Sequence, residues 1–96
     1  MRVAMLMRHD GVTIDQYEQI RKAIDLDANF PQGAVVHMVT HDGNGLRISD
    51  VWESADDLNA FAKDRLMPAL HQAGITAQPQ IEVYPLHALL SPELVG

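Results

Sequence analysis

Cysteine is absent from the 96 residues, so disulfide bonds cannot stabilise the fold. The apolar share of 47% is enough for one folded core, and the length leaves no room for a second, so we predict a single domain over residues 1–96. A domain of this size buries only about 60 to 65% of the surface of its unfolded chain, which predicts marginal stability. Self-association is the remedy that remains, and we expect a homodimer.

Basic residues are scarce as well. Seven lysines and arginines stand against thirteen aspartates and glutamates, which gives a formal net charge of -6 at pH 7. Such a surface repels a phosphate backbone or an anionic lipid surface, so we expect neither nucleic acid nor a membrane as a partner. The early apolar run from Val3 to Met7 is too short for a signal peptide or a membrane span. We therefore expect a soluble, cytoplasmic protein.

The histidines do not form a metal-binding pattern. No HxH or HExxH sequence occurs, and His37 and His41 lie four residues apart on a predicted strand, which separates them by about 13 Å. The ligands of one zinc ion each lie about 2 Å from the metal. We therefore expect no metal and no other cofactor.

What the chain does contain is a series of short apolar runs and two amphipathic stretches. We predict strands over residues 3–7, 35–39, 46–52 and 80–86, and helices over residues 14–25 and 55–74. Thr13 and Gln16 form a capping box at the start of the first helix. Pro68 should kink or break the second helix near Leu66, because proline lacks a backbone donor and clashes with the preceding turn.

The resulting order, βαββαβ, predicts the fold class: an α+β, ferredoxin-like plait whose four-stranded antiparallel sheet has the strand order 4-1-3-2. The helices of this fold cover one face of the sheet, so the other face and the two edges stay open. Two copies can hide these surfaces by packing sheet against sheet. We expect such a dimer to enclose a cavity between its two sheets.

The segment from His41 to Gly45 is a strong hairpin signal. With Gly43-Asn44 as a two-residue turn, opposite residues have numbers that sum to 87, which pairs His37 with Asp50. The flanking pairs in this register are Val39 with Ile48 and Val35 with Trp52. A histidine oriented by a carboxylate among apolar neighbours is a candidate general base, while the alternative is a structural cross-strand pair. A three-residue turn would send the two side chains to opposite faces.

Five further residues are candidates for a pocket that binds an apolar or aromatic ligand: Trp52, Tyr84, His87, Met5 and Met7. Trp52 is either a core residue or the floor of a pocket for a flat ligand, and Tyr84 has the same two interpretations. His87 follows a predicted edge strand and would either approach a partner subunit or end in solvent. The two methionines either fill gaps in the core or line an adaptable cavity.

The chain resembles the dimeric α/β-barrel superfamily, and within it small proteins related to antibiotic biosynthesis monooxygenases. The resemblance covers nearly the whole chain, and its most specific residues are Trp52-Glu53-Ser54 at the junction between the third strand and the second helix. The other segments that carry it are residues 11–13, 33–37, 65–69 and 83–87. The resemblance implies a homodimer with an apolar pocket. Members that degrade haem often carry a histidine about ten residues after the tryptophan, where this chain has Ala62.

Some members of the superfamily oxidise aromatic, polyketide-like phenols with molecular oxygen and no cofactor. The leading hypothesis is therefore a cofactor-independent monooxygenase in which His37, oriented by Asp50, deprotonates a phenol or enol. A cyclase or isomerase of the same fold would use the same base without oxygen. A non-enzymatic ligand-binding or regulatory module is the alternative of a different class.

Overall fold

The computed structural model describes residues 1–93 and has the predicted βαββαβ order. The strands are β1 (Val3–Asp10), β2 (Ala34–His41), β3 (Gly45–Trp52) and β4 (Gln80–Pro85). The helices are α1 (Ile14–Ala23), α2 (Ala55–Phe61) and α3 (Met67–Gln72), and a π-helical segment, η1 (Ala62–Leu66), joins the last two. The order of strands in the sheet is β2-β3-β1-β4, with every neighbouring pair antiparallel. The predicted ferredoxin-like fold is confirmed.

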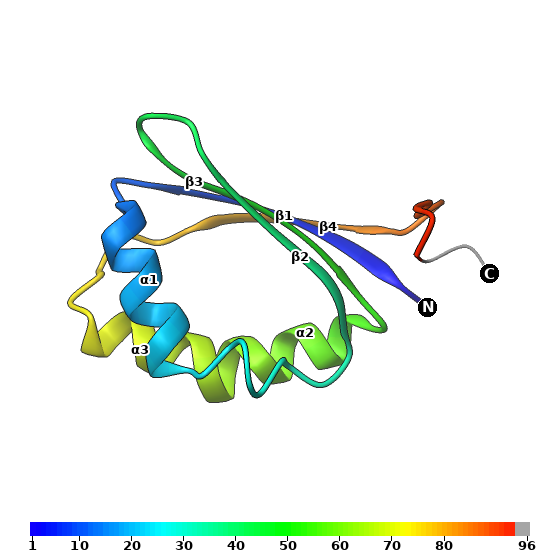
Figure 1. The fold of residues 1–96 in the computed structure, drawn as a ribbon, viewed down its shortest axis with the longest axis horizontal. Helices are drawn as coiled ribbons and strands as arrows, with labels where there is room; N and C mark the ends of the chain where they lie inside the picture. The colour runs from blue at the N-terminus through cyan, green and yellow to red at the C-terminus, as the bar shows by residue number, and fades with distance from the viewer. Residues whose placement is uncertain (94–96) are drawn as a thin grey trace.

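All the helices lie on one face of the twisted sheet, and the opposite face carries none of them (Figure 1). On the covered face, β1 and β3 contribute most of the buried core, which includes Val3, Met5, Met7, Leu46, Ile48 and Trp52. None of the helices within residues 1–93 is both long and apolar enough to cross a membrane. The fold therefore has one packed face and one open face.

Strand β1 is three residues longer than the predicted strand, which ends at Met7. The polar residues Arg8, His9 and Asp10 extend it because they pair with the start of β3. This pairing satisfies their backbone groups, and the side chains alternate: His9 is buried, whereas Arg8 and Asp10 are exposed.

The first helix starts as the sequence predicts and ends two residues early. The Thr13 hydroxyl accepts from the Gln16 backbone N–H, and the Gln16 side chain accepts from the Thr13 backbone N–H, which completes the capping box. The helix ends at Ala23 rather than at Asp25. Asp25 itself has a φ of 53°, in the left-handed region, so it turns the chain out of the helix.

The predicted disturbance before Pro68 takes the form of the π-helical segment η1. Here the Met67 N–H donates to the Ala62 carbonyl, five residues back, instead of four. The wider turn places Pro68 in the first turn of α3, where a backbone donor is not needed. The single predicted helix over 55–74 is therefore three connected helical segments that end at Gln72.

The β2–β3 hairpin has the predicted register near its turn. His37 lies opposite Asp50 and Val39 opposite Ile48, and the Asp42 N–H donates to the Gly45 carbonyl at 3.1 Å. Gly43 has a φ of 95°, a conformation that favours glycine in such a turn.

The predicted pair Val35–Trp52 is wrong, because the register shifts between Ala34 and Val36. Trp52 lies opposite Ala34, and Val35 is an extra residue in β2. Such a bulge increases the local twist of a strand, and it leaves the side chains nearer the turn on their predicted faces.

Candidate functional site

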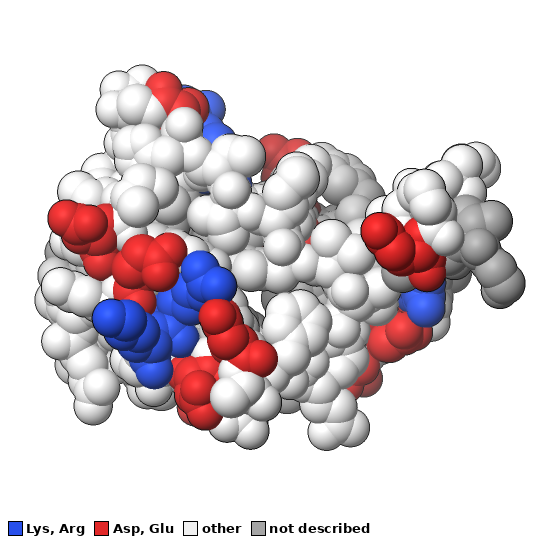
Figure 2. Space-filling view, in the orientation of Figure 1, with Lys and Arg blue, Asp and Glu red and all other residues white. Residues whose placement is uncertain are grey.

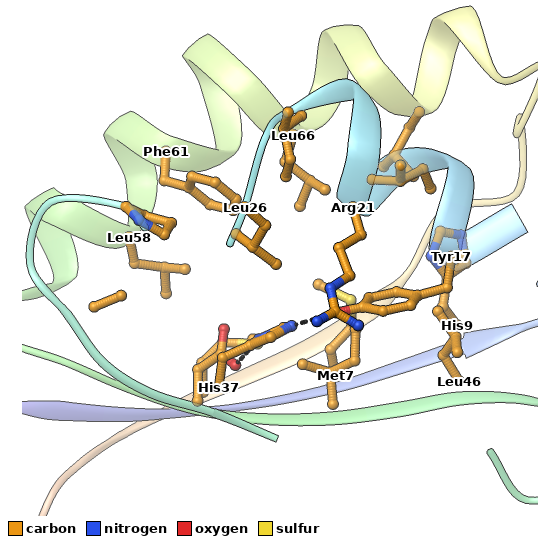
Figure 3. Close-up of a pocket in the computed structure, with 18 of the residues that line it drawn as sticks. Met7, His9, Tyr17, Arg21, Leu26, His37, Leu46, Leu58, Phe61 and Leu66 are labelled. Atoms are coloured by element: carbon orange, nitrogen blue, oxygen red, sulfur yellow. Dashed lines mark hydrogen bonds and ion pairs between the residues drawn. The ribbon is translucent and has the colours of Figure 1, made fainter. Parts of the chain in front are cut away.

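An apolar inner cavity lies between the sheet and the helices, with a volume of about 70 Å³. Its walls come from the covered face of the sheet, which contributes Met5, Met7, Ile48 and Trp52, and from the helical layer, which contributes Leu58, Phe61 and Leu66. Figure 3 shows the helical side chains above and those of the sheet below. We predicted a cavity between the two sheets of a dimer. The cavity described here lies inside one chain, because the helices cover the sheet face that carries these residues, and the cavity between two sheets stays a prediction.

A chain of hydrogen bonds runs through buried polar groups at this cavity. The Asp50 carboxylate accepts from Nδ1 of His37 at 2.6 Å with its Oδ1 and from the indole Nε1–H of Trp52 at 3.2 Å with its Oδ2. The side chain of Asp50 is 7% exposed and that of His37 is 22% exposed. The indole N–H can only donate, so a carboxylate oxygen is a matched acceptor for it. Asp50 is thus held from two sides, and its contact with Nδ1 orients the imidazole.

Tyr17 of α1 completes the chain on the far side of His37. Its hydroxyl lies 2.8 Å from Nε2 of His37, and the two rings are stacked with their centroids 6.1 Å apart. With Nδ1–H donated to Asp50, Nε2 of the neutral imidazole is an acceptor, so the Tyr17 hydroxyl donates to it. The resulting order is Tyr17–His37–Asp50–Trp52, which joins α1 to the sheet (Figure 3).

Burial raises the pKa of Tyr17 above its ordinary value of 10.0. The Arg21 guanidinium opposes this effect, while the carboxylates of Glu18, Asp50 and Asp27 add to it. The hydroxyl therefore keeps its proton at neutral pH and remains a donor.

A larger, more open hollow with a volume of about 490 Å³ lies between α1 and β2. We call it the outer hollow. The residues that line both it and the inner cavity are Tyr17, Arg21, Leu26, Phe30 and His37. The Tyr17–His37 hydrogen bond therefore sits where the two spaces meet.

The charge at the rim of the outer hollow is paired. Arg21 donates to both carboxylate oxygens of Asp27, at 2.7 and 2.8 Å, and lies 3.5 Å from Glu18. The hydrogen bond from Arg21 lowers the pKa of Asp27. In Figure 2 acidic and basic side chains gather at the left, over the region where Figure 1 draws α1 and the segment that follows it. Arg21 is the one lysine or arginine among the described residues that line the hollow, and two carboxylates already engage it, so it is not free to pair with an anionic ligand.

His9 also lines the inner cavity, although it was not among the predicted site residues. It is 2% exposed, and its Nε2–H donates to the Ala77 carbonyl at 2.8 Å. This bond ties β1 to the segment before β4, which favours a structural role.

The predicted site residues separate into two groups. His37, Asp50, Trp52, Met5 and Met7 all line the inner cavity. Tyr84 and His87 line neither the inner cavity nor the outer hollow. Tyr84 lies on the open face, where its hydroxyl donates to Glu82, and His87 is exposed after the end of β4. The catalytic and binding roles of all seven stay predictions.

Tyr17 was not among the predicted site residues. Its helical spacing with Ile20 and Ile24 indicated that it faces the core, and it does lie on that side of α1. Only the docking of α1 on the sheet brings its hydroxyl to His37. Among residues 1–93 no group of three or more histidines, aspartates or glutamates is arranged to hold a metal ion.

No protein-family model matches the sequence, and a comparison with curated proteins found no match. Similarity to solved structures is clear at low sequence identity. A protein of unknown function from Nitrosomonas europaea has a TM-score of 0.73 at 19% identity, over 95% of this chain and 94% of that one. SnoaB, a cofactor-independent oxygenase from Streptomyces nogalater, has a TM-score of 0.67 at 15% identity, over 93% and 96%.

A dimeric ferredoxin-like protein of unknown function from Thermobifida fusca has a TM-score of 0.62 at 18% identity, over 90% of this chain and 92% of that one. The resemblance predicted from the sequence is thus confirmed at the level of the fold, which this chain shares with ferredoxin-like proteins that include a cofactor-independent oxygenase.

Proposed function

We propose that the protein is a cofactor-independent monooxygenase that acts on a hydroxylated aromatic or enolic compound. The observation that carries the proposal is the buried chain Trp52–Asp50–His37, which presents the imidazole Nε2 at an apolar cavity. The similarity in fold to SnoaB supports the choice of reaction.

The role of His37 is that of a general base. Its Nε2 takes the hydroxyl proton of the substrate, and the Asp50 carboxylate stabilises the imidazolium that forms. The apolar side chains around His37 displace water from the substrate ring, which leaves the substrate anion electron-rich. The protein then needs to supply only the base, the orientation and an apolar surface for the ring.

The overall reaction is balanced with molecular oxygen as the only co-reactant. One oxygen atom forms a bond to a ring carbon in place of its C–H bond, and the substrate hydroxyl becomes a carbonyl. The second oxygen atom leaves as water with the two hydrogens that the substrate loses. The substrate gives up four electrons, which is the number that the two oxygen atoms take.

Oxygen uptake with a panel of naphthols and hydroxylated anthrones tests this function. We expect His37→Ala to lower turnover at least about 100-fold, in line with the loss of a general base. His71→Ala is the matched control, since His71 is an exposed histidine on α3 outside both cavities, and it should leave turnover unchanged. Product formed without oxygen uptake would instead identify a cyclase or isomerase. No turnover, together with no ligand-induced rise in melting temperature, would reject the site.

We also propose that the protein is a homodimer joined through the open face of the sheet. Leu6, Met38 and Tyr84 lie on this face and are each about half exposed. Large apolar side chains exposed on one face of a sheet favour burial against a second copy. Light scattering across a dilution series tests it, since a monomer has a mass of 10.6 kDa and a dimer twice that.

A further inference from the structure

The imidazole of His37 has only two nitrogens, and both already have partners. Nδ1 donates to Asp50 at 2.6 Å, and Nε2 accepts from the Tyr17 hydroxyl at 2.8 Å. A neutral imidazole has a single acceptor nitrogen, so no acceptor remains for the hydroxyl of a substrate. A substrate that gives its proton to His37 must therefore take the place of Tyr17.

The Tyr17 side chain is itself a phenol, and it makes the contact that a phenolic substrate needs. Its oxygen donates to Nε2 at hydrogen-bond distance, and its ring lies in a stack with the imidazole, 22° from parallel. The hydroxyl stays protonated at neutral pH because burial disfavours the phenolate. The contact therefore shows the geometry in which this imidazole receives an aromatic hydroxyl.

The space for a ligand lies on the outer side of this contact. The inner cavity has a volume of about 70 Å³, room for a few water-sized groups, whereas the outer hollow has about 490 Å³. The outer hollow has an apolar wall from Ile14, Phe30, Val35 and Val39, and it reaches His37 directly. An aromatic ring that lies against this wall can bring its hydroxyl to Nε2 from the side of Tyr17.

We propose that a neutral phenol binds in the outer hollow and that its hydroxyl replaces the Tyr17 hydroxyl on Nε2 of His37. Tyr17 is then a positioning residue that holds the imidazole between turnovers and competes with the substrate for one acceptor. The ligand class is a neutral phenol rather than a carboxylate, because Arg21 at the rim is already paired with Asp27 and Glu18. The inference rests on the proposed function and assigns the side from which its substrate enters.

After the exchange, no polar group involved is left without a hydrogen-bond partner. The displaced Tyr17 hydroxyl turns toward the open hollow, where water can hydrogen-bond to it, and the phenol of the ligand satisfies Nε2 in its place. One phenol–imidazole hydrogen bond is broken and one is formed. The competition with Tyr17 therefore lowers the affinity of every hydroxylated ligand by the net strength of the internal bond.

Calorimetric titration with two ligands of nearly the same shape tests the proposal: 4-cyanophenol, which carries the hydroxyl, and benzonitrile, which lacks it. We expect the wild type to bind the two ligands with similar affinity, because it loses the Tyr17 bond to Nε2 for the bond that 4-cyanophenol forms. Tyr17→Phe should bind 4-cyanophenol about 3- to 10-fold more tightly, which corresponds to the net strength of one hydrogen bond. Benzonitrile should bind equally well to both proteins. Ser49→Ala removes a hydroxyl outside both cavities and should change neither affinity.

Two further readouts separate displacement from a purely structural effect. The NMR shift of Nε2 in His37 should move in Tyr17→Phe and return toward its wild-type value when 4-cyanophenol is added. In the Tyr17→Phe protein, the additional change His37→Ala should remove the preference for 4-cyanophenol over benzonitrile.

Weaker binding of 4-cyanophenol to Tyr17→Phe would overturn the inference, because Tyr17 would then be a contact of the ligand rather than its competitor. The proposed function would survive that result if the preference for the hydroxyl still depended on His37. A Tyr17→Phe protein that does not distinguish the two ligands would overturn both.

Discussion

The two faces of the sheet differ in which side chains they bury and which they expose. On the covered face Asp50 and His37 lie among apolar walls, and every nitrogen and oxygen of the chain from Tyr17 to Trp52 has a partner. On the open face the large apolar side chains of Leu6, Met38 and Tyr84 are each about half exposed. Burial of hydrogen-bonded polar groups gives the first face its chemistry, and exposure of apolar groups makes the second face suited to contact with another surface.

The sharpest comparison uses two neighbours on β3 that point to opposite faces. Asp50→Asn keeps the size of the side chain but removes the charge that stabilises a protonated His37, so we expect oxygen uptake to fall at least about 100-fold. Ser49→Ala, on the open face, should leave uptake unchanged. Equal rates for the two variants would remove Asp50 from the mechanism.

A change on the open face should affect assembly and spare the site. Leu6→Asp places a charge in the proposed contact, so we expect the dissociation constant of the dimer to rise at least about 30-fold, the effect of losing a hot-spot residue. Light scattering on diluted samples measures it, with Asp50→Asn as the control that should keep the doubled mass. A Leu6→Asp protein that stays dimeric would place the interface elsewhere.

The free energy of unfolding should depend more on Trp52, on the covered face, than on Tyr84, on the open face. Trp52→Phe loses the hydrogen bond to Asp50 and leaves a gap in the core, so we expect the free energy of unfolding to drop by about 2 kcal/mol. Tyr84→Phe should change it by less than about 0.5 kcal/mol, as is usual at the surface. Denaturant titration followed by circular dichroism compares the two variants.

The smallest expected effect is a dependence of stability on alkaline pH. Because burial raises the pKa of Tyr17 in the folded state, its proton is held more tightly there than in the unfolded chain. Tyr17 therefore contributes stability below pH 10.0, and this contribution is lost as the pH rises through the raised pKa.

Two variants resolve the source of this alkaline loss. Tyr17→Phe should show a smaller decline in unfolding free energy above pH 10.0 than the wild type. The titratable and charged groups that face the Tyr17 hydroxyl are His37, Arg21, Glu18, Asp27 and Asp50. Tyr84→Phe isolates Tyr17 in an absorbance titration, because a hydrogen bond to Glu82 also raises the pKa of Tyr84. A Tyr17→Phe protein with the wild-type decline would assign the effect to other groups.

Local rules in the sequence accounted for much of the fold. The capping box at Thr13 starts α1, and the glycine-containing turn sets the pairing of His37 with Asp50, since a hairpin register follows from the length of its turn. Pro68 disturbs the second helix where its missing N–H predicts. Each of these features depends on residues only a few positions apart, or on one tight turn between them.

The tertiary structure alone decided which side of the sheet holds the site and which residue completes it. The bulge at Val35 changes the partner of Trp52, and the docking of α1 brings Tyr17 to His37 across 20 positions of sequence. The alternation of side chains on a strand assigns residues to two faces without saying which face the helices cover. That choice depends on how well the whole helical layer packs, so the cavity, its outer hollow and the contact between them follow from the complete fold.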